Sequence, residues 1–500
     1  MATAKNTILA PLPDDIIHKI LRFLPTKSAV RMRCVSKKFE DLWSIDLDEG
    51  DPPLDNPHQH TEFINNSKTY LDSREKDRHV DKFRLRMMRY SPKVDDAVVS
   101  RYLDFAFLRN VMMLDISLRS KPGIPYYRLH PGFLEQNFIT TLKLEYVRIN
   151  IGYSPINLPL LKTLSLKTVI LDSQNSLPRL GPEKEPLSRL VSACPNIENL
   201  SLNLKDSTHD TYCLSVRTLL GAKYITNLDL ESVKIVDEIN NISSPRHVPL
   251  KTMCLKTVHL HPRSLFGIIS GSPSLEYLSL TSSSFPRGSS LQFSSSSLKT
   301  LEVTDCNAQQ LNVSEAVNLE SFTLVSAIPQ RGSEIGQLAR TALHGCENLK
   351  HVNIRAERLQ DIVLGGCKDC VEATIEAPNL RYFNFSGNLK STISMEAPNL
   401  LDARITLLCG NSTSPWRHFP TLVDFLKTFG HSKRILLHAD GDDEDIVFPE
   451  SFRKSLLGPP LPSLKYLEVY REAKLKGRDS DLRNSMLWMA PCADLKIKNK

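Results

Sequence analysis

The sequence has few cysteines and no long apolar run. Ten cysteines are scattered over 500 residues without a short, evenly spaced framework, which argues against a disulfide-stapled secreted domain. The first fifteen residues contain no apolar stretch long enough for a signal peptide, and no window reaches the length of a membrane span. We therefore expect an intracellular protein of the nucleus and/or cytoplasm, with no membrane partner.

Enzyme motifs are also missing. The sequence contains no phosphate-binding G-x-x-x-x-G-K-[ST], no dinucleotide-binding G-x-G-x-x-G and no nucleophile-elbow G-x-S-x-G. The fourteen histidines are dispersed, and none sits in a pattern that marks a catalytic base or a metal ligand. These absences predict a protein without catalytic activity and without a cofactor.

Two local clusters suggest metal ligands, but each lacks part of the required pattern. Cys367 and Cys370 form one C-x-x-C, whereas a tetrahedral zinc site needs a second pair of ligands at matching spacing. The acidic run that starts at Asp440 has Asp445 and Ser451 where an EF-hand loop requires glycine and glutamate. The sequence therefore predicts no metal site.

The sequence has only a small excess of positive charge. The net charge is +7, from 63 basic and 56 acidic residues, and the short basic clusters have no aromatic stacking residues or nucleic-acid module beside them. Each cluster is better interpreted as a solvated face than as a phosphate-binding track. Nucleic acid is accordingly the least favoured binding partner.

Residues 12–43 are rich in apolar side chains at helical spacing. Pro13 and the two aspartates after it form a favourable first helical turn, and the following isoleucines and leucines make one apolar face up to Pro25. Thr26 and Ser36 are placed to cap a second and a third short helix. About three helices in some thirty residues cannot bury all these side chains among themselves, so part of this surface should need a partner.

This stretch resembles the F-box of plant F-box/leucine-rich-repeat proteins. The matching phrases are Leu12-Pro13-Asp14, Ile20-Leu21, Leu24-Pro25 and Val35-Ser36-Lys37-Lys38 ahead of Leu42-Trp43, with Phe39 where this version often has tryptophan. The resemblance implies an F-box over residues 8–45 that binds a Skp-type adaptor and, through it, a cullin-RING ubiquitin ligase. The adaptor-binding anchors that it implies are Leu12, Pro13, Ile16, Ile20, Leu21, Leu24, Pro25, Val30 and Val35.

Residues 46–79 are acidic and interrupted by prolines in their first part. Such a stretch is not a helix interior, and we interpret it as a linker. Its later part, from Glu62 to Leu71, is expected to form a helix that caps the following domain.

Residues 80–500 repeat one pattern, in which an apolar residue is followed three and five positions later by two more. The triads start at Val80, Val111, Ile139, Leu161, Ile197, Ile225, Leu250, Leu275, Leu298, Leu319, Leu349, Leu380 and Leu464. Starts between Leu250 and Leu319 are 25, 23 and 21 residues apart, as in leucine-rich repeats. The pattern predicts an α/β solenoid with a parallel sheet on the concave face and helices and loops on the convex face.

The segments between the triads differ along the chain. Residues 186–194 and 262–269 have helical spacing, whereas residues 291–300 are serine-rich, and two Glu-Ala-Pro-Asn-Leu phrases that start at Glu376 and Glu396 lead into strands through extended turns. The asparagine or cysteine ladder of regular repeats is largely missing, with Cys306 among the few residues in that place. Ser432-Ile435-Leu437 is one further candidate unit, and residues 482–497 should form a closing cap.

The resemblance covers most of the chain and implies a substrate-recognition subunit of an SCF-type (cullin-RING) E3 ubiquitin ligase. One alternative is an F-box/leucine-rich-repeat scaffold that does not promote degradation, and a less favoured one is a nucleic-acid-associated protein. The target protein is unknown, and a small molecule in the solenoid is left open. No residue is assigned to target binding, although several concave-face positions are noted: Ser165, Ser201, Asp229, Ser279, Glu302 and Thr323.

Overall fold

The structure is a computed structural model. It describes residues 44–50, 57–73, 80–121, 123–151, 155–172, 185–204, 212–236, 247–325, 349–367, 371–387, 391–408, 419–440, 446–456, 458–471 and 479–499. The chain divides into two compact units, residues 1–233 and residues 234–500, and each unit is described by itself. The three helices expected in residues 12–43 lie outside the described residues.

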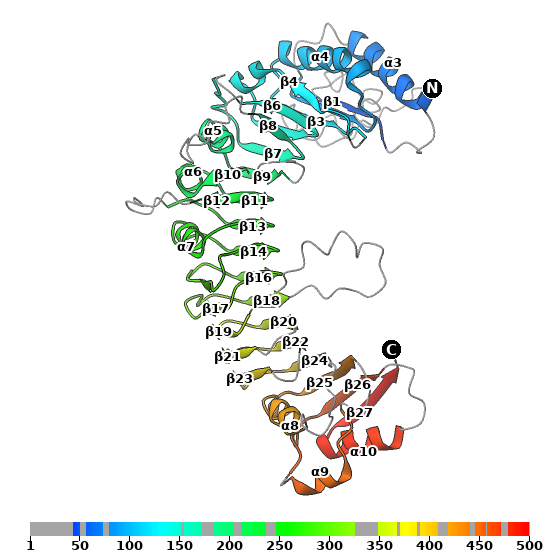
Figure 1. The fold of residues 1–500 in the computed structure, drawn as a ribbon, viewed down its shortest axis with the longest axis vertical. Coiled ribbons are helices and arrows are strands. Elements are labelled where there is room, and N and C mark those ends of the chain that lie inside the picture. The colour runs from blue at the N-terminus through cyan, green and yellow to red at the C-terminus, as the bar shows by residue number, and fades with distance from the viewer. Residues whose placement is uncertain are drawn as a thin grey trace, which may run out of the picture. The chain divides into compact units, whose positions relative to one another are not determined.

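The first unit is built on a parallel sheet in which neighbours in the chain are neighbours in space (Figure 1). Its strands, in spatial order, are β1 (Ser44–Asp48), β2 (Lys82–Met87), β3 (Met113–Leu118), β5 (Thr141–Glu145), β7 (Thr163–Lys167), β9 (Asn199–Asn203) and β11 (Asn227–Glu231). A smaller parallel sheet contains β4 (Tyr127–Leu129), β6 (Val147–Asn150) and β8 (Ile170–Asp172).

The connections of the first unit contain helices of different lengths. They are α3 (Pro57–Ser73), α4 (Pro92–Leu108), the 3-10 helix η2 (Pro131–Glu135), α5 (Pro186–Ser192) and α6 (Val216–Gly221), with strand β10 (Cys213–Ser215) directly before α6. In Figure 1, α5 and α6 lie to the left of β7 and β9. The helix expected in residues 186–194 is therefore confirmed as α5.

The second unit has the same architecture. Its main sheet has the spatial order β13 (Thr252–Lys256), β14 (Tyr277–Thr281), β16 (Thr300–Thr304), β18 (Ser321–Val325), β20 (Asp361–Cys367), β22 (Tyr382–Gly387), β24 (Asp402–Leu408), β25 (Arg434–Asp440), β26 (Tyr466–Arg471) and β27 (Asp494–Asn499). Strand β12 (Lys234–Val236) and helix α7 (Pro262–Ser270) belong to its first repeats, and α8 (Phe419–Lys427), α9 (Glu450–Ser455) and α10 (Asp479–Met489) to its last ones.

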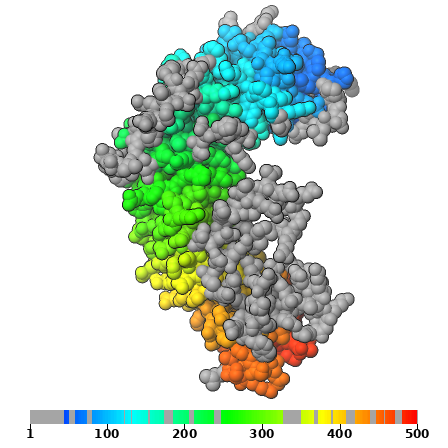
Figure 2. All heavy atoms as spheres, in the orientation of Figure 1, coloured from blue at the N-terminus to red at the C-terminus, as the bar shows by residue number. Residues whose placement is uncertain are grey.

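The apolar triads form the core, as the sequence predicts. In β14, Leu278 and Leu280 are buried and pair in register with Leu301 and Val303 of β16. Leu275, the first residue of the same triad, is buried in the turn that leads into the strand. Alternation along each strand thus places one row of side chains in the core and the next on the exposed face. Within the second unit, the green repeats that follow residue 250 form one continuous surface in the space-filling view (Figure 2).

A left-handed residue ends many of these strands. It is a non-glycine residue with φ between 48° and 60°, directly after β5, β7, β11, β13, β14 and β16: Tyr146, Thr168, Ser232, Thr257, Ser282 and Asp305. The N–H of Ser282 donates to the Thr304 carbonyl of the next repeat at 2.7 Å, and that of Asp305 to Val325 at 2.9 Å. This hydrogen bond offsets the cost of the left-handed backbone.

An asparagine ladder runs through the turns before the strands, which the sequence did not indicate. The side-chain amide of Asn399 donates to the Pro378 backbone carbonyl at 2.9 Å, and that of Asn379 donates to the Glu357 backbone carbonyl at 2.8 Å. Asn196 makes the same bond to Pro159 at 2.7 Å. Each bond joins one repeat to the turn of the preceding repeat. At the position expected for a ladder, Ser283 and Cys306 instead donate to the Leu255 and Leu280 carbonyls.

The second unit also has a second parallel sheet, which the sequence pattern did not predict. It contains β15 (Ser290–Gln292), β17 (Gln310–Val313), β19 (His351–Arg355), β21 (Glu372–Glu376) and β23 (Thr392–Glu396), and it runs beside β16 to β24 in Figure 1. Repeats of about 20 residues leave no room for a helical turn of useful length. The returning chain therefore pairs as strands and satisfies its backbone in that way.

This arrangement corrects one of the predicted triads. The strand of Leu349, Val352 and Ile354 is β19, which lies in the second sheet and not in the main sheet. The main sheet continues instead through β20, where Ile362 and Leu364 are buried. The triad pattern has the same period on both sheets, so the sequence does not tell them apart.

The expected linker of residues 46–79 also needs correction at its start. Ile45 and Leu47 alternate with polar residues and are buried, and residues 44–48 form β1, which pairs with β2. The prolines that suggested a linker begin only at Pro52. The helix expected between Glu62 and Leu71 is α3, which extends from residue 57 to residue 73.

The last repeats enclose an aromatic cluster. The Phe448 ring lies 5.3 Å from the ring centroids of Phe419 and Trp488, and it stacks on Phe452 at 6.1 Å. The candidate unit Ser432-Ile435-Leu437 is confirmed as β25, with Ile435 and Leu437 fully buried. The cap expected in residues 482–497 consists of α10 and β27.

Candidate functional site

The exposed face of each main sheet is made by the residues that alternate with the core. In the first unit, Ser165 pairs in register with Ser201, and Ser201 with Asp229. The positions noted from the sequence therefore form one continuous row on that face. No side chain in this row has the neighbours that a catalytic nucleophile needs, and the Ser201 hydroxyl donates to the Asp229 carboxylate at 3.2 Å.

Charges alternate across the first strands of this face and largely neutralise one another. Arg84 on β2 lies between Asp46 on β1 and Asp115 on β3, with N···O distances of 3.5 and 3.7 Å. Burial raises the pKa of the Asp115 carboxyl, against the attraction of Arg84. Farther along the face, Lys167 pairs with Glu145 at 2.7 Å. Paired charges of this kind contribute little net attraction for a ligand.

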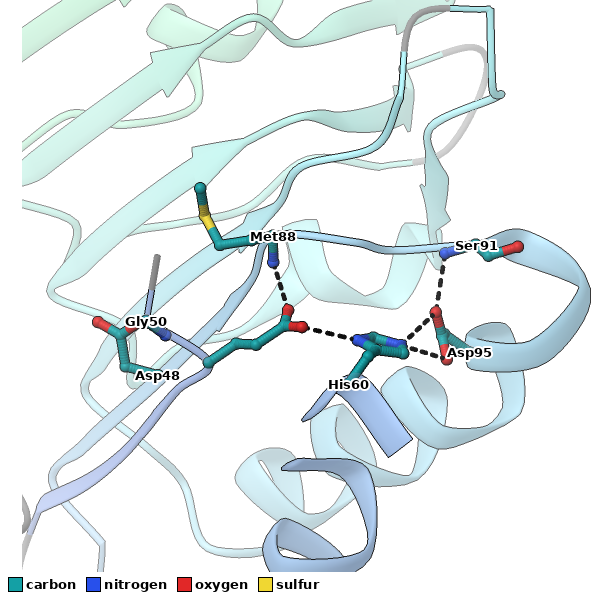
Figure 3. A network of polar contacts seen from close by, with 7 residues as sticks. Asp48, Gly50, His60, Met88, Ser91 and Asp95 are labelled. Atoms are coloured by element: carbon teal, nitrogen blue, oxygen red, sulfur yellow. Dashed lines mark hydrogen bonds and ion pairs between the residues drawn. The ribbon is translucent and has the colours of Figure 1, made fainter. Parts of the chain in front are cut away.

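A buried ionic cluster joins the end of β1 to the helices α3 and α4 (Figure 3). His60, from α3, contacts Glu49, directly after β1, through Nδ1 at 2.9 Å. Its Nε2 contacts both carboxylate oxygens of Asp95, from α4, at 3.2 Å. The Met88 N–H donates to Glu49 at 2.6 Å, and the Ser91 N–H donates to Asp95 at 2.8 Å.

The electrostatics of this cluster favour the imidazolium. The hydrogen bonds to Asp95 and Glu49 raise the pKa of His60 to about 9, against the effect of burial. Burial acts to raise the pKa of Glu49, but the bonds from His60 and Met88 bring it below its usual value. Both ring nitrogens of His60 therefore donate, and none remains to accept a proton from a substrate. The cluster is suited to hold α3 and α4 together and not to perform catalysis.

The first strands of the second unit present a nearly neutral face. Ser279, Glu302 and Thr323 form its central row, as the sequence predicts. The Tyr277 hydroxyl donates to the Glu302 carboxylate at 2.6 Å. Burial, followed by this hydrogen bond, raises the pKa of Tyr277 to about 12. The row offers hydroxyl groups and one compensated carboxylate.

The last strands of the same sheet have a different composition. Tyr382 on β22 and Tyr466 on β26 are each 49% exposed. The Arg434 guanidinium lies 5.8 Å from the centroid of the Tyr466 ring and 3.6 Å from the Asp402 carboxylate. The Tyr470 hydroxyl donates to Glu468 at 2.9 Å. Tyrosine and arginine together are typical of protein-binding surfaces.

The triad pattern alone does not single out these tyrosines, although their position in the sequence is informative. Tyr382 and Tyr466 each stand directly before the second residue of a triad, at a position that points outward in every repeat. Most repeats have a polar residue at this position, whereas Tyr382, Tyr466 and also Tyr277 place an aromatic ring there, and exposed aromatic groups of this kind can indicate an interaction surface. The cluster around His60 left no such signal, because its members are up to 46 residues apart in the chain.

The described residues give two findings on metals and membranes. No group of three or more His, Cys, Asp or Glu side chains suited to a metal ion occurs among them, and Cys370, the second cysteine of the C-x-x-C, lies outside them. No described helix has both the length and the apolar character that a membrane crossing requires. The predictions that no metal and no membrane partner are involved remain predictions.

The anchors predicted for adaptor binding lie outside the described residues. They are Leu12, Pro13, Ile16, Ile20, Leu21, Leu24, Pro25, Val30 and Val35. Their assignment stays a prediction.

Two family models match this chain. The F-box domain matches residues 9–47, and the family described as "FBD-associated F-box protein At5g56370, LRR repeats" matches residues 216–339. Both models describe an F-box or a repeat module, and neither describes an enzyme. The matches confirm the resemblance found in residues 12–43 and in the repeats.

Similar curated proteins come from Arabidopsis thaliana. The putative F-box/LRR-repeat protein At5g02930 is 24% identical, over 46% of this chain and 43% of that protein. The FBD-associated F-box protein At5g60610 is 28% identical, over 42% of this chain and 49% of that protein. The F-box/FBD/LRR-repeat protein At4g00160 is 24% identical, over 52% of this chain and 55% of that protein. The chain spans about half the length of the curated relatives it matches.

Among solved structures, the plant peptide hormone receptor RGFR1 in complex with RGF2 aligns over 85% of this chain and 84% of that chain. The identity is 12% and the TM-score is 0.23. This similarity is too low to bear on function.

Proposed function

We propose that this chain is a member of the plant F-box/leucine-rich-repeat protein family and a substrate-recognition subunit of an SCF-type E3 ubiquitin ligase. F-box domains generally bind Skp-type adaptors, and leucine-rich repeats generally bind target proteins. The observation that carries the proposal is the F-box match at residues 9–47 ahead of a long repeat array. The protein acts in the nucleus and/or cytoplasm.

In this proposal the chain performs no chemistry of its own. The F-box binds the adaptor and, through it, the cullin and the RING subunit, while the repeats hold the protein to be ubiquitinated. Holding two reactants close together in a fixed orientation replaces a bimolecular encounter by an effectively unimolecular one. The rate gain comes from positioning the target lysines near the activated ubiquitin.

Adaptor binding is assigned to the apolar face of the first predicted helix. Leu21 and Leu24 lie on that face, whereas Lys19 and Arg22 lie off it. Burial of one large aliphatic side chain contributes about 1.5–3 kcal/mol, so a few such anchors overcome the cost of association. An unpaired carboxylate in the same contact is strongly unfavourable.

The test is capture of a recombinant Skp-type adaptor by the full chain in a pull-down. Leu21→Asp with Leu24→Asp should abolish capture, whereas Lys19→Asp with Arg22→Asp should retain it. Circular dichroism of each variant controls for folding of the repeats. Equal capture by the first variant and the unmodified chain would refute the assigned face.

A second measurement tests the role in degradation. Proteins purified with the intact chain under proteasome inhibition are compared with those purified with a chain that lacks residues 1–45. A target that binds both chains, and is stabilised in cells that produce only the shorter one, is the expected result. A target whose half-life is the same in both cells would instead favour a scaffold that does not promote degradation.

A further inference from the structure

The last five strands of the main sheet in the second unit carry a surface that differs from the rest of that sheet. We name it the tyrosine patch, and it is defined by outward-facing residues of β22, β24, β25, β26 and β27: Tyr382, Arg404, Arg434, Leu436, Tyr466 and Lys496. They lie in two adjacent rows. Tyr382, Asp402, Arg434 and Tyr466 are in register in the first row, and Arg404, Leu436, Glu468 and Lys496 in the second.

The apolar part of the patch is suited to contact with another molecule. The two tyrosines of the first row are each 49% exposed. Leu436 is half-buried in the second row, on strand β25, which lies between the strands of the two tyrosines. A tyrosine ring offers a large contact area and loses little conformational entropy when it is immobilised. Such rings, beside arginine, are frequent among the residues that dominate binding energy.

Two carboxylates of this face, Asp402 and Glu468, are already compensated, whereas Asp494, in register with Tyr466 at the edge of the face, is exposed. Asp402 lies 3.6 Å from the Arg434 guanidinium. Glu468 pairs with Lys498 and accepts a hydrogen bond from Tyr470, and these contacts, the lysine first, lower its pKa. By contrast, within the described residues no carboxylate lies within ion-pair distance of the exposed Arg404 or Lys496, although the charge of Lys496 makes a small contribution to the lowered pKa of Glu468.

The turns that lead into these strands add further positive charge. An exposed cation directly precedes each of β22, β25 and β26: these are Arg381, Lys433 and Lys465. The turns are adjacent, because the Lys465 N–H donates to the Lys433 carbonyl at 3.2 Å. Cations on neighbouring turns produce a positive potential over this end of the sheet.

We propose that the tyrosine patch binds an extended, acidic segment of the target protein in which carboxylates alternate with aromatic or aliphatic side chains. The carboxylates pair with Arg404 and Lys496, and the apolar side chains pack on Leu436 and the tyrosines. This inference rests on the proposed function and names the class of target. Four strand spacings of about 4.8 Å make the patch about 19 Å wide, so about six extended residues cross it.

A nucleic acid is a less suitable occupant. Asp402, Glu468 and Asp494 lie on the same face, where they would approach a phosphate backbone. Repulsion between like charges opposes such binding. A peptide can place its carboxylates beside the cations and its apolar side chains elsewhere, whereas a phosphate backbone has negative charge at every step.

The test measures fluorescence anisotropy of three labelled probes with the full chain. They are a peptide of about ten residues in which Glu alternates with Leu and Tyr, the same peptide with Lys in place of Glu, and a single-stranded oligouridylate of similar length. We expect the Glu peptide to bind at least tenfold more tightly than the other two. Arg404→Glu with Lys496→Glu should weaken its binding at least tenfold.

A matched control separates the patch from net charge. Lys143→Glu with Lys223→Glu changes the charge by the same amount at exposed sites in the first unit, and it should leave binding of the Glu peptide within twofold. The proposal is overturned if both double variants lose binding equally, if the Arg404 and Lys496 variant binds normally, or if the Glu peptide binds no better than the Lys peptide. Tighter binding of the oligouridylate would identify a nucleic-acid surface instead.

Failure of this inference differs from failure of the proposed function. The Arg404 and Lys496 variant should still capture the Skp-type adaptor, because its substitutions lie in the repeats. If the unmodified chain captures no adaptor, the ligase role fails whatever the peptide does. If the adaptor is captured but the Glu peptide does not bind, only the assignment of the patch fails.

Discussion

The Nε2 atom of His60 lies 3.2 Å from each carboxylate oxygen of Asp95. This contact joins α3, which follows the first strand, to α4, which follows the second. The Asp95 residue is fully buried and the His60 side chain is 16% exposed. A buried carboxylate of this kind requires a cation or hydrogen-bond donors, and His60 and the Ser91 N–H provide them.

The stability of this part of the chain should fall at alkaline pH. The bonds to Asp95 and Glu49 raise the pKa of His60 from 6.5 to about 9. Because the folded state binds this proton more tightly, the stabilisation is complete below about pH 6.5, declines above it and is lost once pH passes about 9. Hydrogen exchange of α3, corrected for intrinsic rates, should show lower protection at pH 9.5 than at pH 6. Equal protection at the two values would disprove this linkage.

Removal of the imidazole should destabilise the first unit. His60→Ala leaves the carboxylates of Glu49 and Asp95 buried without their shared cation, which costs about 3–5 kcal/mol. Denaturant unfolding followed by tyrosine fluorescence, with hydrogen exchange to locate the effect, measures the loss. Asn66→Ala, at an exposed position of the same helix, is the control and should cost less than about 0.5 kcal/mol. Similar losses for both variants would argue against a special role for His60.

The asparagine ladder should contribute measurably to the coupling between repeats. Asn399→Ala removes the bond of its amide to the Pro378 carbonyl, at 2.9 Å, and should lower the free energy of unfolding by about 1 kcal/mol. Asn384→Ala, on the outward face of β22, should have a smaller effect. Thermal denaturation of the two variants makes the comparison. A greater loss for Asn384→Ala would contradict the role of the ladder.

A cavity in the core shared by neighbouring repeats should lower the free energy of unfolding. Leu301 is fully buried and pairs in register with Leu278 on one side and Phe322 on the other. Leu301→Ala should therefore cost about 2–5 kcal/mol, and the loss should extend to neighbouring repeats, because each repeat is stabilised mainly by the next. Thr323→Ala, on the exposed face, is the control. Hydrogen exchange that stays unchanged in the two adjacent repeats would show that they are not coupled in this way.

The sequence by itself determined the repeat, its strands and the direction of their side chains. Leu275, Leu278 and Leu280 predict a turn, a strand and two core positions, because alternation along a strand and burial of apolar groups are local rules. The same rules located β25 from Ile435 and Leu437 alone.

Only the tertiary structure decided which strands belong to which sheet and which distant side chains meet. Strands β19 and β20 have the same pattern, yet they pair with different neighbours. His60 reaches Glu49 across 11 residues and Asp95 across 35, and the tyrosine patch forms from strands that are separated by returns of different length. Contacts of this kind depend on the register of stacked repeats, and that register is a property of the folded chain and not of any short segment.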